Sequence, residues 1–117
     1  MPVYYLTGDL LFSSRVSGAA ANLGVDLQIV GSVAQLLQRA DAPGDCKLVL
    51  IDLTLSSLAL DAAVQAIRER MPQARIVAYG PHVHEALLTA AAAAGCDEVL
   101  SRGQFDREFP RLLRSAM

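Results

Sequence analysis

Short apolar runs alternate along this chain with stretches in which apolar residues recur every three or four positions. The runs are four or five residues long, the length of a β-strand in an ordinary domain. They predict five strands: Val3–Leu6, Leu27–Val30, Leu48–Ile51, Arg75–Tyr79 and Glu98–Ser101.

A helical pattern follows each run. After the first, Phe12, Val16, Ala19 and Leu23 fall at i, i+4, i+7 and i+11, which is one stripe of a helix, and Gly24 is typical of its end. The same spacing follows the other runs. The expected helices carry Val33, Leu36, Leu37 and Ala40 after an N-cap at Ser32; Leu60, Val64, Ile67 and Met71 with a cap at Asp61 and an end at Pro72; Val83, Leu87, Ala90 and Ala94 before Gly95; and Phe109, Leu112 and Ala116 from about Asp106.

Five strand–helix units in succession predict a parallel α/β sheet, because each crossover must return over one face of the sheet. The run Leu48–Ile51 has no polar alternation, which is typical of a strand covered on both faces. Five units of this size favour the flavodoxin-like strand order 2-1-3-4-5, with helices on both faces in three α/β/α layers. Residues 1–117 are predicted to form a single domain, with residues 42–45 (Ala-Pro-Gly-Asp) as a turn.

Composition narrows the possible partners. The 117 residues are 53% hydrophobic and 19% charged, and the net charge is −2, so we expect no surface built for nucleic-acid phosphates. No run approaches the ~18 apolar residues of a membrane span. Cys46 and Cys96 form no C-x-x-C motif, so the sequence favours a cytoplasmic, reduced location with two buried thiols.

Ligands of such sheets bind at the carboxyl ends of the strands. Asp52 stands at the mouth of the central strand, where a buried carboxylate must meet water, a cation or helix-terminus amides. The residues predicted at this edge are Thr7, Gly8 and Asp9; Asp52, Thr54 and Ser56; Gly80, Pro81 and His82; and Arg102 and Gly103.

Two segments carry a family resemblance. LVLIDLTL, with Asp52, and AGCDEVLSRGQF, residues 94–105, resemble a response-regulator receiver domain, in which the second stretch commonly reads A-G-A-D-D-Y-L-T-K-P-F. The resemblance implies a signalling module of a two-component system. It makes Asp52 the phosphoacceptor for a histidine kinase, with Mg²⁺ bound when Asp52 is phosphorylated.

Several positions depart from the family pattern. The acidic pair that holds the metal reads Thr7-Gly8, with Asp9 one place later, so the predicted ligands are Asp9, Asp52 and the backbone carbonyl of Thr54. Asp9 is also a good cap for the following helix. The family's Lys-Pro reads Arg102-Gly103; Arg102 is the candidate counter-charge for a phosphate, or a salt-bridge partner of Asp52 without one.

In the family, a hydroxyl residue and an aromatic residue move together when the aspartate is phosphorylated, and this chain has neither of them. The hydroxyl expected after strand four is Gly80, and the aromatic side chain expected in strand five is Val99. Without them, phosphate would have no two-state element to bias. The sequence therefore favours a degenerate receiver, a pseudo-receiver, that signals by protein contact.

Two alternatives stay open: a working phosphorelay receiver that uses Asp52, Asp9 and Arg102, and a small-ligand module that uses space beside Gly80. No nucleotide-loop or nucleophile-elbow motif is present, and we predict no enzyme activity. His82 and His84 with Glu85 make a weak candidate for a metal site. The alanine-rich helix after His84 is a candidate surface for a homodimer or another protein, together with the fifth strand and fifth helix.

Overall fold

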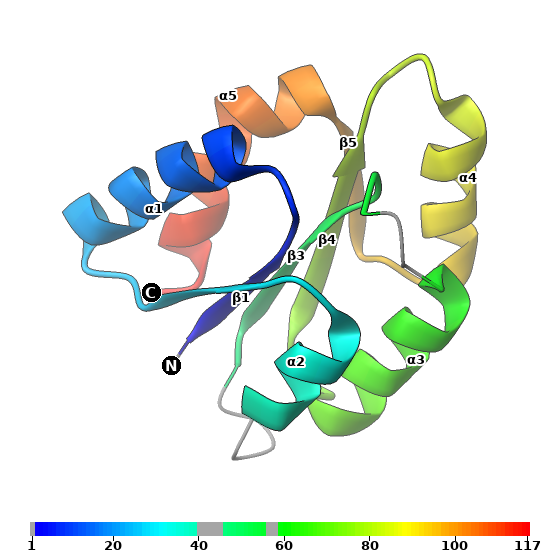
Figure 1. Ribbon diagram of the computed structural model, residues 1–117, viewed down its shortest axis with the longest axis horizontal. Coiled ribbons are helices and arrows are strands. Elements are labelled where there is room, and N and C mark those ends of the chain that lie inside the picture. The colour runs from blue at the N-terminus through cyan, green and yellow to red at the C-terminus, as the bar shows by residue number, and fades with distance from the viewer. Residues whose placement is uncertain (1, 40–45, 56–58) are drawn as a thin grey trace.

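The structure, a computed structural model, describes residues 2–39, 46–55 and 59–117 (Figure 1). Strands and helices alternate from end to end, as the hydrophobic pattern predicts. The elements are β1 (Val3–Leu6), α1 (Leu10–Leu23), β2 (Leu27–Val30), α2 (Val33–Arg39), β3 (Leu48–Asp52), α3 (Leu60–Arg70), β4 (Arg75–Gly80), α4 (Glu85–Ala94), β5 (Glu98–Ser101) and α5 (Arg102–Ser115). The predicted turn at residues 42–45, Ala40 and Ser56 lie outside the described residues.

All five strands pair in parallel, in the order β2-β1-β3-β4-β5. This is the flavodoxin-like order, so the predicted fold class is confirmed. β3 lies at the centre of the sheet, between β1 and β4. Asp52, its last residue, is in register with Tyr79 of β4, and this brings the ends of β1, β3 and β4 together at the carboxyl edge.

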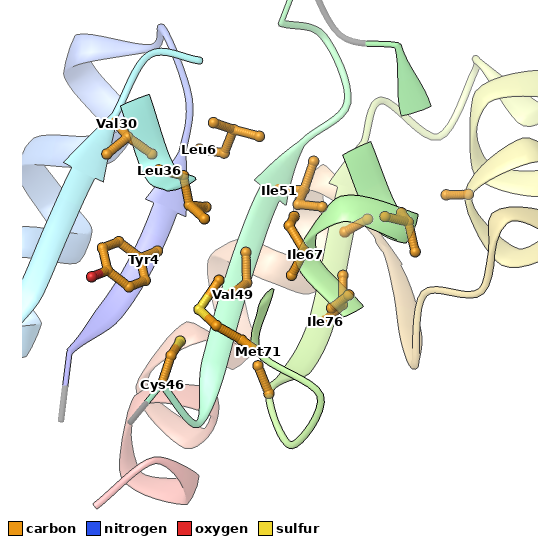
Figure 2. Packing of buried hydrophobic residues seen from close by; sticks show 14 of the residues in the cluster. Tyr4, Leu6, Val30, Leu36, Cys46, Val49, Ile51, Ile67, Met71 and Ile76 are labelled. Carbon is orange, nitrogen blue, oxygen red and sulfur yellow. The ribbon is translucent and has the colours of Figure 1, made fainter. Parts of the chain in front are cut away.

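Two hydrophobic layers cover the two faces of the sheet. α2, α3 and α4 lie over one face and α1 and α5 over the other (Figure 1). β3 sends alternate residues into each layer: Val49 and Ile51 into the first, Leu48 and Leu50 into the second. Figure 2 shows the first layer, which contains Ile67 of α3, Met71 just after α3, and Val49 of β3. Both faces of β3 are therefore buried, which explains its unbroken apolar sequence.

The second layer is aromatic near the carboxyl edge. Phe105 of α5 stacks on Tyr79, with ring centroids 4.0 Å apart and planes 9° from parallel. The hydroxyls of Tyr5 and Tyr79 form a 2.5 Å hydrogen bond. Phe12 of α1 completes the cluster, with its ring centroid 5.6 Å from that of Phe105. The cluster fixes the starts of α1 and α5 relative to the sheet, directly below the edge that carries the candidate site.

Most predicted helix ends are confirmed. Asp9 is the N-cap of α1 and accepts a hydrogen bond from the Phe12 N–H. Ser32 accepts one from the Gln35 N–H at the start of α2. Gly24 and Gly95 end α1 and α4 with φ of 72° and 104°, a backbone conformation that strains other residues. Within the described residues, every helix is too short or too polar to cross a membrane.

The predicted start of α5 is wrong by one turn. The helix begins at Arg102, not near Asp106, because Ser101 and Gln104 form a capping box. Phe105, which is fully buried, therefore belongs to the helix and to the aromatic cluster. Pro110 lies in the helix interior rather than in its first turn, where its missing N–H leaves the carbonyl one turn earlier without that helical bond.

Two further details of the helix predictions need correction. Asp61 does not cap α3; the N-cap is Ala59, without a side-chain hydrogen bond, and Asp61 lies in the first turn. In α4, Val83 and Ala90 are exposed, and Val83 precedes the helix. The inward residues are Leu88, Ala91 and Ala94, so only Ala94 of the predicted stripe is confirmed in the core layer, and the helix begins two residues later than that stripe.

Candidate functional site

The candidate site is a cleft at the carboxyl edge of the sheet. It is lined by Gly8, Asp9, Asp52, Thr54 and Leu55 and has a volume of about 390 Å³. Asp52 forms its floor and is 1% exposed, so its carboxylate is withdrawn from bulk water. A buried anion of this kind must find hydrogen-bond donors or a cation within the protein.

Two threonines supply those donors. Asp52 Oδ2 accepts a hydrogen bond from the Thr7 hydroxyl at 2.7 Å. Its Oδ1 accepts one from the Thr54 hydroxyl at 2.7 Å and one from the Thr54 N–H at 3.0 Å. Both carboxylate oxygens are therefore satisfied by neutral groups of the chain itself.

Thr7 also anchors the loop that follows β1. Its N–H donates to the Val30 carbonyl, and its hydroxyl oxygen accepts from the Asp9 N–H at 3.0 Å. The loop is therefore held in the register in which Asp9 caps α1. A shift of one residue, which would bring Asp9 into the position of the family's acidic pair, would break these bonds.

The tyrosine pair lies below the same threonine. Burial raises the pKa of Tyr5 from 10.0 to about 12, partly offset by its hydrogen bonds to Tyr79 and Thr7, and the nearby Asp52 charge adds to the increase. Burial likewise raises the pKa of Tyr79. Both side chains are neutral at physiological pH, so the tyrosine pair brings no second charge near Asp52.

Arg102 is directed at Asp9 rather than at Asp52. Its Nη2 lies 2.9 Å from Asp9 Oδ2, while Asp9 Oδ1 accepts the Phe12 N–H at 3.0 Å. The guanidinium also lies over the Phe12 ring, 5.6 Å from its centroid, as in a cation–π contact. The sequence placed Arg102 and Asp9 at one edge, and the structure joins them in an ion pair between the starts of α1 and α5.

The predicted switch position, Gly80, is buried under apolar side chains. A Cβ added there would lie 3.5 Å from Leu53 and 3.6 Å from Leu88, at ordinary contact distance. The open space that the small-ligand alternative required beside Gly80 is therefore taken by these two leucines. Val99 packs against the core layer under α2, α3 and α4.

The chain was then compared with known proteins. No protein-family model and no curated protein matches it, whereas many solved structures do. The receiver domain of the sensor histidine kinase PA1611 from Pseudomonas aeruginosa PAO1, solved with a magnesium ion coordinated in its active-site cleft, is 19% identical, with a TM-score of 0.77 over 98% of this chain and 95% of that chain.

Two other similar structures extend the comparison. The chemotaxis response regulator CheY4 of Vibrio cholerae is 13% identical, with a TM-score of 0.78 over 99% of this chain and 98% of that one. The beryllofluoride-activated receiver domain dimer of NtrC4 is 12% identical, with a TM-score of 0.75 over 99% and 98%. This chain has the receiver fold.

A magnesium ion is the metal that the receiver fold implies, and the cleft can be tested for its fit. Mg²⁺ requires octahedral oxygen ligands, usually with one or two carboxylates. Asp9 and Asp52 are the two carboxylates that line the cleft, and every one of their oxygens already accepts a hydrogen bond. The described residues contain no group of three or more His, Cys, Asp or Glu side chains suited to a metal. As arranged here, the residues do not fit the ion.

The histidine candidate gains no support either. His82 and His84 are exposed beside Glu85, and no metal-binding group that includes them occurs in the described parts of the chain. Burial raises the pKa of the Cys46 and Cys96 thiols, which disfavours their thiolate forms.

Thr7 is the residue that sequence reasoning underrated. The family pattern marks it only as a missing acid, whereas its hydroxyl donates to Asp52 and accepts a hydrogen bond from the Asp9 N–H. The signal was present: a hydroxyl residue at the end of β1 stands beside the carboxylate at the end of β3, because the two strands are neighbours in this fold. The buried tyrosine pair had no comparable signal, since tyrosine in a strand is common.

Proposed function

We propose that this protein is a pseudo-receiver: a signal-transduction domain of the receiver fold that acts through protein–protein contact, without phosphoryl switching. The observation that carries the proposal is the state of Asp52. It is 1% exposed, and both of its oxygens are bound by Thr7 and Thr54. To accept a phosphoryl group it would have to give up these bonds without a metal to align the donor.

The surroundings of Asp52 support the same proposal. A phosphorylated aspartate acts as a switch only if some element has two arrangements that the phosphoryl group favours unequally. The hydroxyl and aromatic side chains that would respond are replaced by Gly80 and Val99, both packed into the hydrophobic layer. Arg102, the candidate counter-charge for a phosphate, is engaged by Asp9.

Phosphorylation is tested with a small phosphodonor. The protein is incubated with Mg²⁺ and acetyl phosphate, and its intact mass is measured under mild conditions. A receiver that accepts phosphoryl groups is treated in parallel. We expect no acid-labile mass gain on this chain, because neither the metal nor the nucleophile is available.

A spectroscopic test separates slow chemistry from an absent switch. Beryllofluoride with Mg²⁺ mimics the phosphoryl group. We expect that adding it shifts no amide signals in the NMR spectra of either wild type or Asp52→Asn. A mass gain that disappears in Asp52→Asn, or shifts that spread from the cleft to α4 and α5, would show a working phosphorelay receiver.

For the contact surface we propose the face formed by α4, β5 and α5. Ala86, Ala90 and Ala93 are exposed on α4, so another helix could approach this face closely. β5 is the edge strand, and its Glu98 pairs with Arg75 and Arg111. These charges disfavour pairing of β5 with a strand of another chain. The exposed alanines of α4 are then the accessible part of the face. Its occupant is proposed to be a second copy of the chain.

A further inference from the structure

We infer that the Arg102 guanidinium is the resident cation of the cleft, and that it keeps the cleft closed to divalent metal ions. The inference deepens the proposed function and rests on it, because it gives a physical cause for the missing metal. The loss of acids at Thr7 and Gly8 is one part of that cause. The ion pair between Arg102 and Asp9 is the other.

The position of Arg102 in its helix indicates a role outside that helix. It is the first residue of α5, where the partial positive charge of the helix terminus disfavours a cation. The first turn of α5 has no acidic residue to offset it. Compensation comes instead from another element: Asp9, 2.9 Å away at the start of α1, and the face of Phe12.

Asp9 is held so that it can serve only one cation. Its Oδ1 caps α1 through the Phe12 N–H, and its own N–H is bound to Thr7. The remaining oxygen, Oδ2, is the one that Arg102 contacts. A divalent ion at the cleft would need that same oxygen, so the ion would have to displace the guanidinium from Asp9.

Removing the guanidinium is therefore expected to open a weak metal site. In Arg102→Gln the carboxylates of Asp9 and Asp52 still line the cleft, but the competing charge is gone. The chain also offers a matched control: Arg15 pairs with Asp106 between α1 and α5 and lies 5.6 Å from the Phe12 centroid, away from the cleft. Arg15→Gln removes an equivalent contact without touching the cleft residues.

The experiment uses Mn²⁺ alone as a paramagnetic probe. Line broadening of the Gly8, Asp9 and Thr54 amide signals is followed as Mn²⁺ is added to wild type, Arg102→Gln and Arg15→Gln. We expect Arg102→Gln to show selective broadening at these amides with an apparent affinity at least tenfold above that of wild type and Arg15→Gln. Adding Asp9→Asn to Arg102→Gln should return the affinity to the wild-type level.

Two results would overturn the inference, and the second would also overturn the proposed function. If Arg102→Gln binds Mn²⁺ no better than wild type, the resident-cation inference fails and the pseudo-receiver proposal stands. If wild type already binds Mn²⁺ as well as Arg102→Gln and also gains mass with acetyl phosphate, both fail. The same spectra report whether each variant is folded, so a loss of structure cannot be mistaken for a loss of binding.

Discussion

At the scale of single residues, the central feature is a buried carboxylate that depends on hydroxyl donors. Thr7 is 4% exposed and supplies the bond to Asp52 Oδ2 that a cation supplies in a metal-bound site. Removing a partner from a buried charged group costs more than the bond itself contributes, because the charge is left without a donor. Thr7 is therefore expected to matter for stability beyond its size.

Thr7→Val tests this expectation, since valine keeps the shape and removes the hydroxyl. We expect the free energy of unfolding to fall by about 2–3 kcal/mol. Thr7→Ser, which keeps the hydroxyl, should lose less than about 1 kcal/mol for the missing methyl group. Urea unfolding followed by circular dichroism measures both. Equal losses in the two variants would mean that the bond to Asp52 contributes nothing.

The tyrosine pair predicts a pH dependence with a definite sign. The pKa of Tyr5 is raised from 10.0 to about 12 in the folded chain, chiefly by burial, and that of Tyr79 is raised for the same reason. Between these values the unfolded chain loses protons that the folded chain keeps, so the free energy of unfolding falls as pH rises above 10. Below pH 10 the pair adds no pH dependence.

Urea unfolding at a series of pH values from 9 to 11.5 measures this decline. The double variant Tyr5→Phe/Tyr79→Phe should show a flatter curve over the same range, because it cannot ionise at these positions. A decline of the same steepness in the variant would assign the effect to other groups.

Whether the role of a single residue could be predicted depended on how many partners its position offers. Asp9 as a cap was predicted because a carboxylate before an apolar stripe has one common local role. The threonine hydroxyls that bind Asp52 were not predicted, because a strand-end carboxylate has several candidate partners, and the sequence pointed to water, a cation, helix-terminus amides or Arg102 instead.

At the scale of elements, the hydrophobic pattern located the helices, but the capping residues determine where each helix begins and ends. The start of α5 was misplaced because Arg102-Gly103-Gln104 is polar and contributes nothing to a hydrophobic stripe, whereas the capping box makes it helical. The face of α4 was assigned correctly only at Ala94, because alanines occupy both sides of the helix and the pattern does not distinguish Ala90, which is exposed, from Ala91, which is buried.

α1 contains an element-scale oddity with a testable consequence. Gly18 lies in the exposed interior of the helix, and a Cβ added there would meet no atom within 4 Å. Gly18→Ala should therefore stabilise the chain by about 0.5–1 kcal/mol through the higher helix propensity of alanine. Gly24→Ala is the matched control, because Gly24 has a φ of 72°. It should destabilise by about 1–2 kcal/mol. Thermal unfolding of both variants measures these changes. If Gly18→Ala does not raise the free energy of unfolding, the higher helix propensity of alanine does not act at this position.

At the scale of the whole molecule, the fold was the most predictable feature. Five apolar runs alternating with helical stripes leave few topologies, because parallel strands need crossovers and crossovers are right-handed. The arrangement β2-β1-β3-β4-β5 then brings Thr7, Asp52 and Arg102, which are far apart in sequence, to one edge. What the edge does depends on individual hydrogen bonds, which the same topology accommodates in many ways.

The surface of the whole molecule carries the last prediction, self-association through the exposed side of α4. If the α4–β5–α5 face joins two copies of the chain, light scattering at micromolar concentrations should give the mass of a dimer. Ala90 lies on the exposed side of α4, so Ala90→Arg would place a charge in the helix contact and should return the mass to that of one chain. Ala21→Arg introduces the same charge at an exposed position of α1, over the opposite face of the sheet, and should leave the dimer intact. Wild type at the mass of one chain, or a dimer that survives Ala90→Arg, would rule out a second copy as the occupant of this face.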